Sequence, residues 1–91
     1  MRPKKKIAVI VRDRKKEALR MALGLTLLND DVCVFIMDEK LEMDEDVSMS
    51  LEGLRSMNAR IFTNCSENPF DWKGTEEIAL SLVEYDAVIA Y

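Results

Sequence analysis

The chain has 91 residues, of which 48% are hydrophobic and 33% charged, and its net charge is −4 at pH 7. This balance is typical of a globular protein and too apolar for intrinsic disorder, and the length suits a single domain over residues 1–91. The negative charge argues against nucleic-acid binding, and no apolar run approaches the roughly 18 residues that a membrane span needs.

The first part of the chain predicts a strand, a helix and a second strand. Residues 6–12 form a nearly continuous β-branched run, as expected of a strand that helices cover on both faces. Apolar residues then recur at helical spacing over residues 14–29, and Asp13 can cap that helix. Residues 32–37 repeat the pattern of a doubly covered strand, which ends at Asp38.

The apolar arc of the first helix is wider than contact with one sheet requires. Met21, Leu25 and Leu28 point to a different side from Leu19 and Leu23. Either another helix of the chain or a second subunit covers this extra face. In so short a chain we favour the subunit, so the sequence predicts a homo-oligomer that forms through the first helix.

The second part of the chain continues the alternation of strands and helices. Asp46 or Ser48 can cap a second helix, and Asn58 is a plausible left-handed stop for it. The predicted elements are the second helix over residues 47–57, a third strand over 60–64, a third helix entered at 74–75 and a fourth strand over 86–91.

This alternation predicts a doubly wound α/β fold. We expect a flavodoxin-like three-layer sandwich, with a parallel sheet of about four strands and about three helices. In such sheets, ligands and reacting groups gather beyond the carboxyl ends of the strands. The residues at those ends are Arg12, Asp13, Asp38, Glu39, Lys40, Asn64, Cys65 and Tyr91.

Two cysteines and the absence of histidine narrow the possible chemistry. Most zinc sites and every histidine-based triad are excluded, and in a reducing compartment two free thiols are expected. Cys33 lies in the middle of a strand and should be a small buried hydrophobe. Cys65 is the only nucleophile at a strand end, where Lys73 and the basic residues 12–16 would favour a reactive thiolate and Glu67 would oppose it.

Other familiar sites are missing or weakly indicated. No glycine-rich phosphate loop follows the first strand, so no cofactor is expected. Asp13 and Asp38 could hold a magnesium ion, but helix capping and solvation explain them at least as well, and we expect no metal. The basic run at the start of the chain and the acidic run over residues 38–46 are interpreted as solvated rims. The apolar run at residues 7–11 is too short for a signal peptide, so we expect a cytoplasmic protein.

The order of these segments resembles the DsrE/DsrF/TusD-like superfamily of small sulfur-relay proteins. The resemblance lies in the run Ile7–Val11, the long Ala/Leu helix, the run Val32–Met37 and above all the stretch Leu54–Cys65. In that superfamily a cysteine directly after the third strand can carry a persulfide, and Cys65 stands at that position. The resemblance also implies oligomers, together with sulfur donor and acceptor proteins.

Two functions are therefore expected as alternatives. In the first, the protein is a small DsrE-like sulfur carrier or sulfurtransferase that transfers sulfur through a persulfide on Cys65, without a cofactor. In the second, it is a non-catalytic, oligomeric α/β module that binds a small anion, a nucleotide or a protein partner. The fold does not decide between them.

Overall fold

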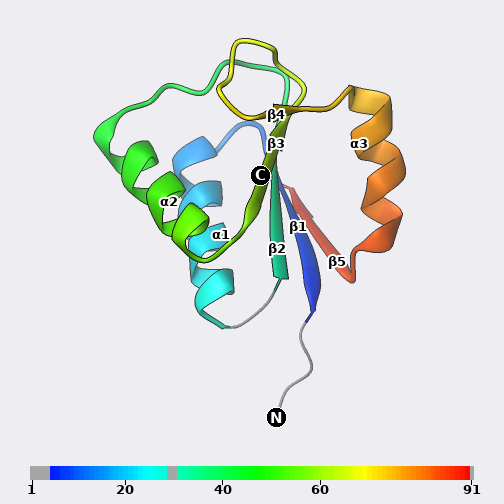
Figure 1. Cartoon of the computed structure of the whole chain (residues 1–91), viewed down its shortest axis with the longest axis horizontal. Coiled ribbons are helices and arrows are strands. Elements are labelled where there is room, and N and C mark those ends of the chain that lie inside the picture. The colour runs from blue at the N-terminus through cyan, green and yellow to red at the C-terminus, as the bar shows by residue number, and fades with distance from the viewer. Residues whose placement is uncertain (1–4, 29–30, 91) are drawn as a thin grey trace.

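A computed structural model of the chain describes residues 5–28 and 31–90. Five parallel strands form one sheet in the order β4-β3-β2-β1-β5, with α1 and α2 on one face and α3 on the other (Figure 1). The elements are β1 (Lys6–Val11), α1 (Lys15–Leu27), β2 (Asp31–Ile36), α2 (Glu45–Ser56), β3 (Arg60–Thr63), β4 (Asp71–Trp72), α3 (Thr75–Ser81), the 3₁₀ helix η1 (Leu82–Glu84) and β5 (Ala87–Ala90). The predicted three-layer α/β architecture is thus present.

The sheet has five strands, whereas the sequence predicts about four. The additional strand, β4, consists of two residues that pair with Phe62 and Thr63 of β3. A two-residue strand is too short to show a periodic pattern, so this segment cannot be distinguished from a loop in the sequence. The layers are compatible with a flavodoxin-like sandwich.

The strand order fixes where the winding of the sheet reverses. The chain passes from β1 to β2 to β3 along one direction, then crosses through α3 on the opposite face and returns to place β5 beside β1. The reversal therefore lies between β1 and β5. In doubly wound sheets the crevice at the carboxyl ends of two such strands is the usual place for a ligand.

Two hydrophobic clusters lie on the two faces of the sheet, because successive residues of a strand point to opposite sides. The larger cluster faces α1 and α2 and is centred on Val9, Val34 and Ile36. The smaller one faces α3 and consists of Ala8, Cys33, Phe35, Met37 and Ile78. One short helix covers this second face, so its core is much smaller.

The extra apolar face of α1 is covered largely by other elements of the same chain. The helices α1 and α2 pack against each other, and Met21, Leu23 and Leu25 lie against the larger cluster. Leu27 and Leu28, at the end of α1, stay 69% and 59% exposed. A second helix of the same chain thus supplies most of the cover for which the sequence analysis favours a subunit, and the homo-oligomer through α1 stays a prediction.

The starts of α1 and α2 differ from the sequence-based expectation, whereas α3 begins at Thr75 after Gly74 as predicted. Arg14, not Asp13, occupies the N-cap of α1, and its side chain makes no capping hydrogen bond. The helix α2 begins earlier than predicted, because Asp44 is its cap and accepts a hydrogen bond from the backbone N–H of Val47 at 2.9 Å. Several acidic residues precede that helix, and the sequence alone does not single out the one with capping geometry.

The end of α2 is as predicted. Asn58 has φ of 63°, and the N–H of Ala59 donates to the carbonyl of Leu54 at 3.0 Å. This is the hydrogen-bond pattern of a Schellman motif, in which a left-handed residue ends the helix.

Candidate functional site

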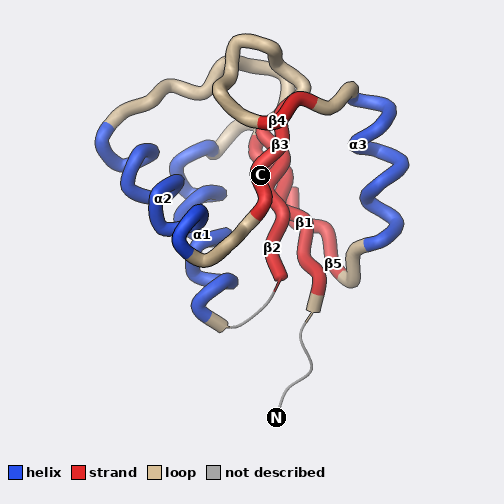
Figure 2. Tube along the Cα trace, in the orientation of Figure 1, coloured by secondary structure: helices blue, strands red, loops and turns tan. Residues whose placement is uncertain are grey.

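The loops that follow the strands gather at one edge of the sheet, at the top of the view in Figure 2. This edge carries most of the candidate residues of the sequence analysis, on the segments after β1, β2 and β3. Tyr91 lies outside the described residues. The predicted juxtaposition of the strand ends is therefore present for three of the four expected strands.

Asn64, directly after β3, joins its own segment to the one that follows β2 and to the start of α3. Its side-chain oxygen accepts from the backbone N–H of Asp38 at 2.6 Å, and its amide nitrogen donates to Asp38 Oδ1 at 3.1 Å and to Thr75 Oγ1 at 2.8 Å. The indole of Trp72 donates to the Asn64 carbonyl at 3.2 Å. Asp38 has φ of 71°, a left-handed conformation that aspartate tolerates better than most residues. Asn64 therefore holds the strand ends together and is not a free ligand group.

A second asparagine, Asn68, also joins the segments at this edge, and its side chain is buried. The sequence analysis did not single it out. Asn68 is 5% exposed, and its side-chain oxygen accepts from the N–H of Leu41 at 2.7 Å. Its amide nitrogen donates to the Glu39 carbonyl at 3.1 Å and to Thr63 Oγ1 at 3.0 Å. The motif Asn68-Pro69 reads as an ordinary turn, so the sequence holds no signal for this role.

The basic and acidic runs, interpreted from the sequence as separate solvated rims, are paired with each other. Arg12 Nε lies 3.1 Å from Asp38 Oδ2 and Lys15 Nζ lies 3.0 Å from Glu39 Oε2. Lys16 Nζ lies 2.7 Å from Asp44 Oδ2, and this hydrogen bond holds the pKa of the Asp44 carboxyl below its ordinary value. A topological argument could have anticipated the pairing, because parallel strands bring the two loops to the same edge.

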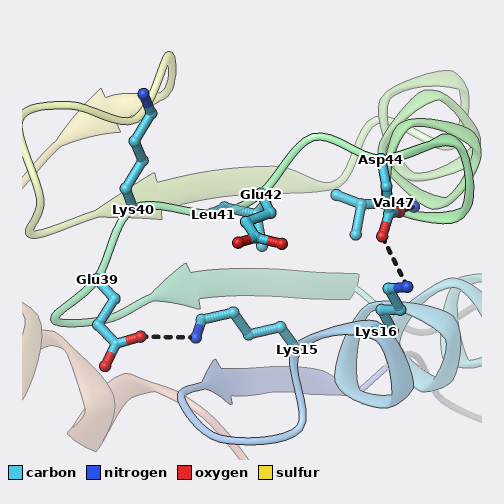
Figure 3. Close-up of a pocket in the computed structure, with 8 residues that line it drawn as sticks. All are labelled: Lys15, Lys16, Glu39, Lys40, Leu41, Glu42, Asp44 and Val47. Atoms are coloured by element: carbon cyan, nitrogen blue, oxygen red, sulfur yellow. Dashed lines mark hydrogen bonds and ion pairs between the residues drawn. The ribbon is translucent and has the colours of Figure 1, made fainter.

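A hollow of about 180 Å³ lies between these two segments (Figure 3). Three acidic and three basic side chains line it, so its charge does not select an anion or a cation. The ion pairs of Lys15 and Lys16 run along its side, whereas Lys40 points away from them (Figure 3).

Metal binding has no support at this edge. Among the described residues, no group of three or more cysteine, aspartate or glutamate side chains could hold a metal ion. Asp38, one of the two carboxylates considered for magnesium, is engaged by Arg12 and Asn64.

A second hollow of about 230 Å³, lined by Arg12, Asp13, Met37, Asp38 and Glu39, has an excess of acidic side chains.

Cys65 lies where the sequence predicts, directly beyond the end of β3. It is a free, half-buried thiol, and its backbone N–H donates to Thr63 Oγ1 at 3.1 Å. Its carbonyl accepts from the N–H of Asn68 at 3.1 Å. The backbone that carries this thiol is therefore fixed on both sides by hydrogen bonds to residues that are themselves buried.

The cations that the sequence analysis expects around Cys65 are engaged elsewhere. Arg12, Lys15 and Lys16 pair with the acidic segment, and Lys73 Nζ lies over the ring of Phe62, 4.4 Å from its centroid. Cys65 also lines neither of the two hollows at this edge. The position of the thiol beyond β3 is thus confirmed, and each of these four cations has another partner.

Cys33 is a buried core residue, as predicted. It is 1% exposed and belongs to the cluster beneath α3. Burial raises the pKa of its thiol, and a hydrogen bond with Tyr85 opposes that rise in part. Such a thiol is kept neutral and packs as an apolar side chain.

Exposed apolar side chains gather on α3, η1 and β5. Leu80 is 70% exposed, Val83 86% and Val88 45%. We call these three residues the α3–β5 surface. In the described part of the chain, no helix combines the length and the apolar character that crossing a membrane requires.

Comparison with known proteins finds no matching family model, no matching curated protein and no matching solved structure.

Proposed function

We propose that the protein is a sulfur carrier in which Cys65 holds a transferable sulfur atom as a persulfide. The observation that carries the proposal is the position of Cys65, a free and half-buried thiol at the carboxyl end of β3. Reacting groups of doubly wound sheets lie beyond the carboxyl ends of strands, and Cys65 occupies such an end, although β2 separates β3 from the reversal between β1 and β5. The resemblance of the stretch Leu54–Cys65 to the DsrE/DsrF/TusD-like superfamily supports the same residue.

The transfer is a pair of thiol exchange steps. The Cys65 thiolate attacks the outer sulfur of a donor persulfide, a new S–S bond forms, and the donor leaves as a thiolate. An acceptor thiolate then attacks the outer sulfur of the Cys65 persulfide. The outer sulfur moves to the acceptor, and the Cys65 sulfur leaves as a thiolate. Electrons balance in both steps without an oxidant or a cofactor.

The surroundings of Cys65 make a partner necessary in this proposal. The nearby cations are held by carboxylates or by Phe62, so a donor or acceptor protein would supply positive charge to the reacting thiol when it docks. The hydrogen bonds at the backbone of Cys65 keep the thiol in place for that encounter. Two free thiols also suit the reducing cytoplasm, where we place the protein.

Intact mass after incubation with a sulfane-sulfur donor tests the proposal. We expect the native protein to gain one sulfur atom, which peptide mapping assigns to Cys65. A Cys65→Ser variant should gain none, and a Cys33→Ala variant should react as the parent protein does because Cys33 is buried. If Cys65 is alkylated by iodoacetamide in the folded protein but takes up no sulfur, the proposal is wrong.

A second candidate is a non-catalytic, oligomeric binding module of the same fold. The α3–β5 surface favours it, because α3, η1 and the edge strand β5 each carry a large exposed apolar side chain. Patches of this kind mark protein–protein contacts. The two candidates differ in one respect that is easily measured: partner binding by such a module is unchanged in Cys65→Ser, whereas sulfur transfer is abolished.

A further inference from the structure

A groove of about 320 Å³ lies along the outer side of β3, at the opposite end of that strand from Cys65. Its floor is formed by Arg60 and Ile61 of β3. Arg55, near the end of α2, forms one wall, and the segment Pro69–Phe70, which leads into β4, forms the other. We call it the arginine groove.

The strand edge in the arginine groove is open. β2 pairs with all four residues of β3, from Arg60 to Thr63, but on the outer side β4 reaches only Phe62 and Thr63. In the described part of the chain, the first two residues of β3 thus have no strand beside them. Pro69 precedes β4 and has no N–H to donate, which explains why the pairing does not continue along the edge.

The charge of the groove is opposite to that of the molecule. Two arginines line it against one carboxylate, that of Asp71, in a chain whose net charge is −4. Within residues 5–28 and 31–90, Arg55 and Arg60 take part in no ion pair. The Arg55 guanidinium lies over the ring of Phe70, 5.7 Å from its centroid, which limits its freedom and leaves its donors available.

We propose that the arginine groove binds a short acidic segment of a partner protein in an extended conformation. The segment lies in an extended conformation along the groove, beside the two residues of β3 that β4 leaves without a paired strand. Carboxylates of the segment accept hydrogen bonds from Arg55 and Arg60, a pairing that the planar guanidinium favours. An apolar side chain of the segment packs on the half-buried ring of Phe70.

This binding is independent of the chemistry proposed for Cys65. The groove lies at the amino end of β3 and includes neither Cys65 nor its hydrogen-bond partners. The experiment is therefore performed on Cys65→Ser as well as on the parent protein, and equal affinities are expected. A loss of binding in Cys65→Ser would assign the peptide to the other end of the strand and overturn the proposal.

Fluorescence anisotropy with a labelled hexapeptide that alternates glutamate and valine provides the test. We expect the double variant Arg55→Gln/Arg60→Gln to bind about tenfold or more weakly than the parent. Arg20→Gln is the matched control, since Arg20 is an exposed arginine that lines a different hollow, between α1 and α2. Equal weakening in Arg20→Gln, or equal binding of the same peptide with lysine for glutamate, overturns the proposal.

A second readout locates the peptide. In amide NMR spectra of the parent protein, we expect the largest shifts on peptide addition at Arg60, Ile61 and Phe62. Shifts confined to the α3–β5 surface, or no binding at millimolar peptide, would contradict the proposal. Circular dichroism of each variant confirms that the arginine substitutions, which affect exposed side chains, leave the fold intact.

Discussion

At the residue scale, buried asparagine side chains do more for the candidate edge than its charges. Asn68 makes three hydrogen bonds, two to the segment that follows β2 and one to Thr63 at the end of β3. The ion pairs nearby are largely exposed to solvent, and such pairs contribute little to stability. The shape of this edge therefore depends chiefly on neutral hydrogen bonds.

The replacement Asn68→Ala should destabilise the protein by about 3 kcal/mol, because three hydrogen bonds are lost and the N–H of Leu41 is left buried without a partner. Urea unfolding followed by circular dichroism measures the change. Asn64→Ala is the comparison, since its hydrogen bonds are exposed, and it should cost only about 1 kcal/mol. Equal effects of the two variants would contradict this ranking.

Alkaline pH should destabilise the protein through Tyr85 and Cys33. Burial raises the pKa of the Tyr85 phenol, and it also raises the pKa of the Cys33 thiol. The folded chain keeps these protons at pH values at which the unfolded chain, with ordinary values of 10.0 and 9.0, releases them. The unfolded state then binds fewer protons, so stability falls as the pH rises above about 9.

Urea unfolding between about pH 8 and pH 11 tests this dependence. Tyr85→Phe removes the phenol but keeps the edge-on contact of the ring with Phe35, whose centroid lies 6.0 Å away. We expect the variant to lose less stability across this range than the parent. Parallel curves for the two proteins would mean that Tyr85 ionises equally well in both states.

The candidate site shows which residue-scale properties a sequence can reveal. The burial of Cys33 follows from its apolar neighbours, and the position of Cys65 follows from the end of a strand pattern. The ion-pair partner of Lys15 cannot be read from the sequence. Glu39 lies on another loop, and the geometry of both loops decides which charged side chains meet. The position of Cys65 could therefore be predicted, whereas the partners of the charges around this edge could not.

At the element scale, a glycine of α2 lies directly against a side chain of α1. A Cβ atom on Gly53 would lie 2.8 Å from Leu23 Cδ1, whereas a Cβ atom on Gly24 would meet nothing within 4 Å. The sequence analysis therefore had no means to distinguish the two helical glycines, since the packing partner of each depends on how α1 and α2 are arranged. Only the glycine of α2 marks a close helix contact.

These two glycines give a matched pair of substitutions. Gly24→Ala should stabilise the protein by about 0.5–1 kcal/mol, because alanine favours the helix and has free space at this position. Gly53→Ala should gain less, since the side chain of Leu23 must move to admit the new methyl group. Thermal unfolding measures both, and a larger gain from Gly53→Ala would contradict the packing seen between the helices.

The long elements were predictable because each one carries a period. The strands β1 and β2 are continuous apolar runs and α1 repeats its apolar positions at helical spacing, so all three were expected within a few residues of their observed bounds. β4 was missed because it has two residues and takes its structure from the neighbouring β3. Short elements of this kind are decided by tertiary contacts.

At the scale of the whole molecule, the two faces of the sheet are covered unequally. Two helices pack on one face and a single seven-residue helix with η1 lies on the other (Figure 1). Exposed apolar residues occur on both sides: Leu80, Val83 and Val88 lie on α3, η1 and β5, and Leu27, Leu28 and Met49 lie on α1 or α2 or at the end of α1. Two surfaces are therefore candidates for the contact in a self-associated protein, the end of α1 and the α3–β5 surface.

Sedimentation equilibrium with two paired variants distinguishes these surfaces. If the oligomer forms through α1 as the sequence predicts, Leu27→Lys/Leu28→Lys should shift it to monomer and Val83→Lys/Val88→Lys should not. The opposite result would assign the contact to the α3–β5 surface. Both pairs replace exposed side chains, so the monomer should stay folded, and a parent protein that is monomeric at high micromolar concentration would contradict self-association itself.

The pairing of β1 with β5 has a consequence for how the chain folds. The backbone N–H of Lys6 donates to Asp86 Oδ2 at 2.8 Å, and the N–H of Asp86 donates to the Lys6 carbonyl at 2.7 Å. These hydrogen bonds join the start of β1 to the residue before β5, which lies 80 positions further along the sequence. Closing so long a loop is slow compared with joining β1 to β2. During synthesis, the edge of β1 that later pairs with β5 therefore stays unpaired until β5 emerges, and in that interval it can pair with other nascent chains.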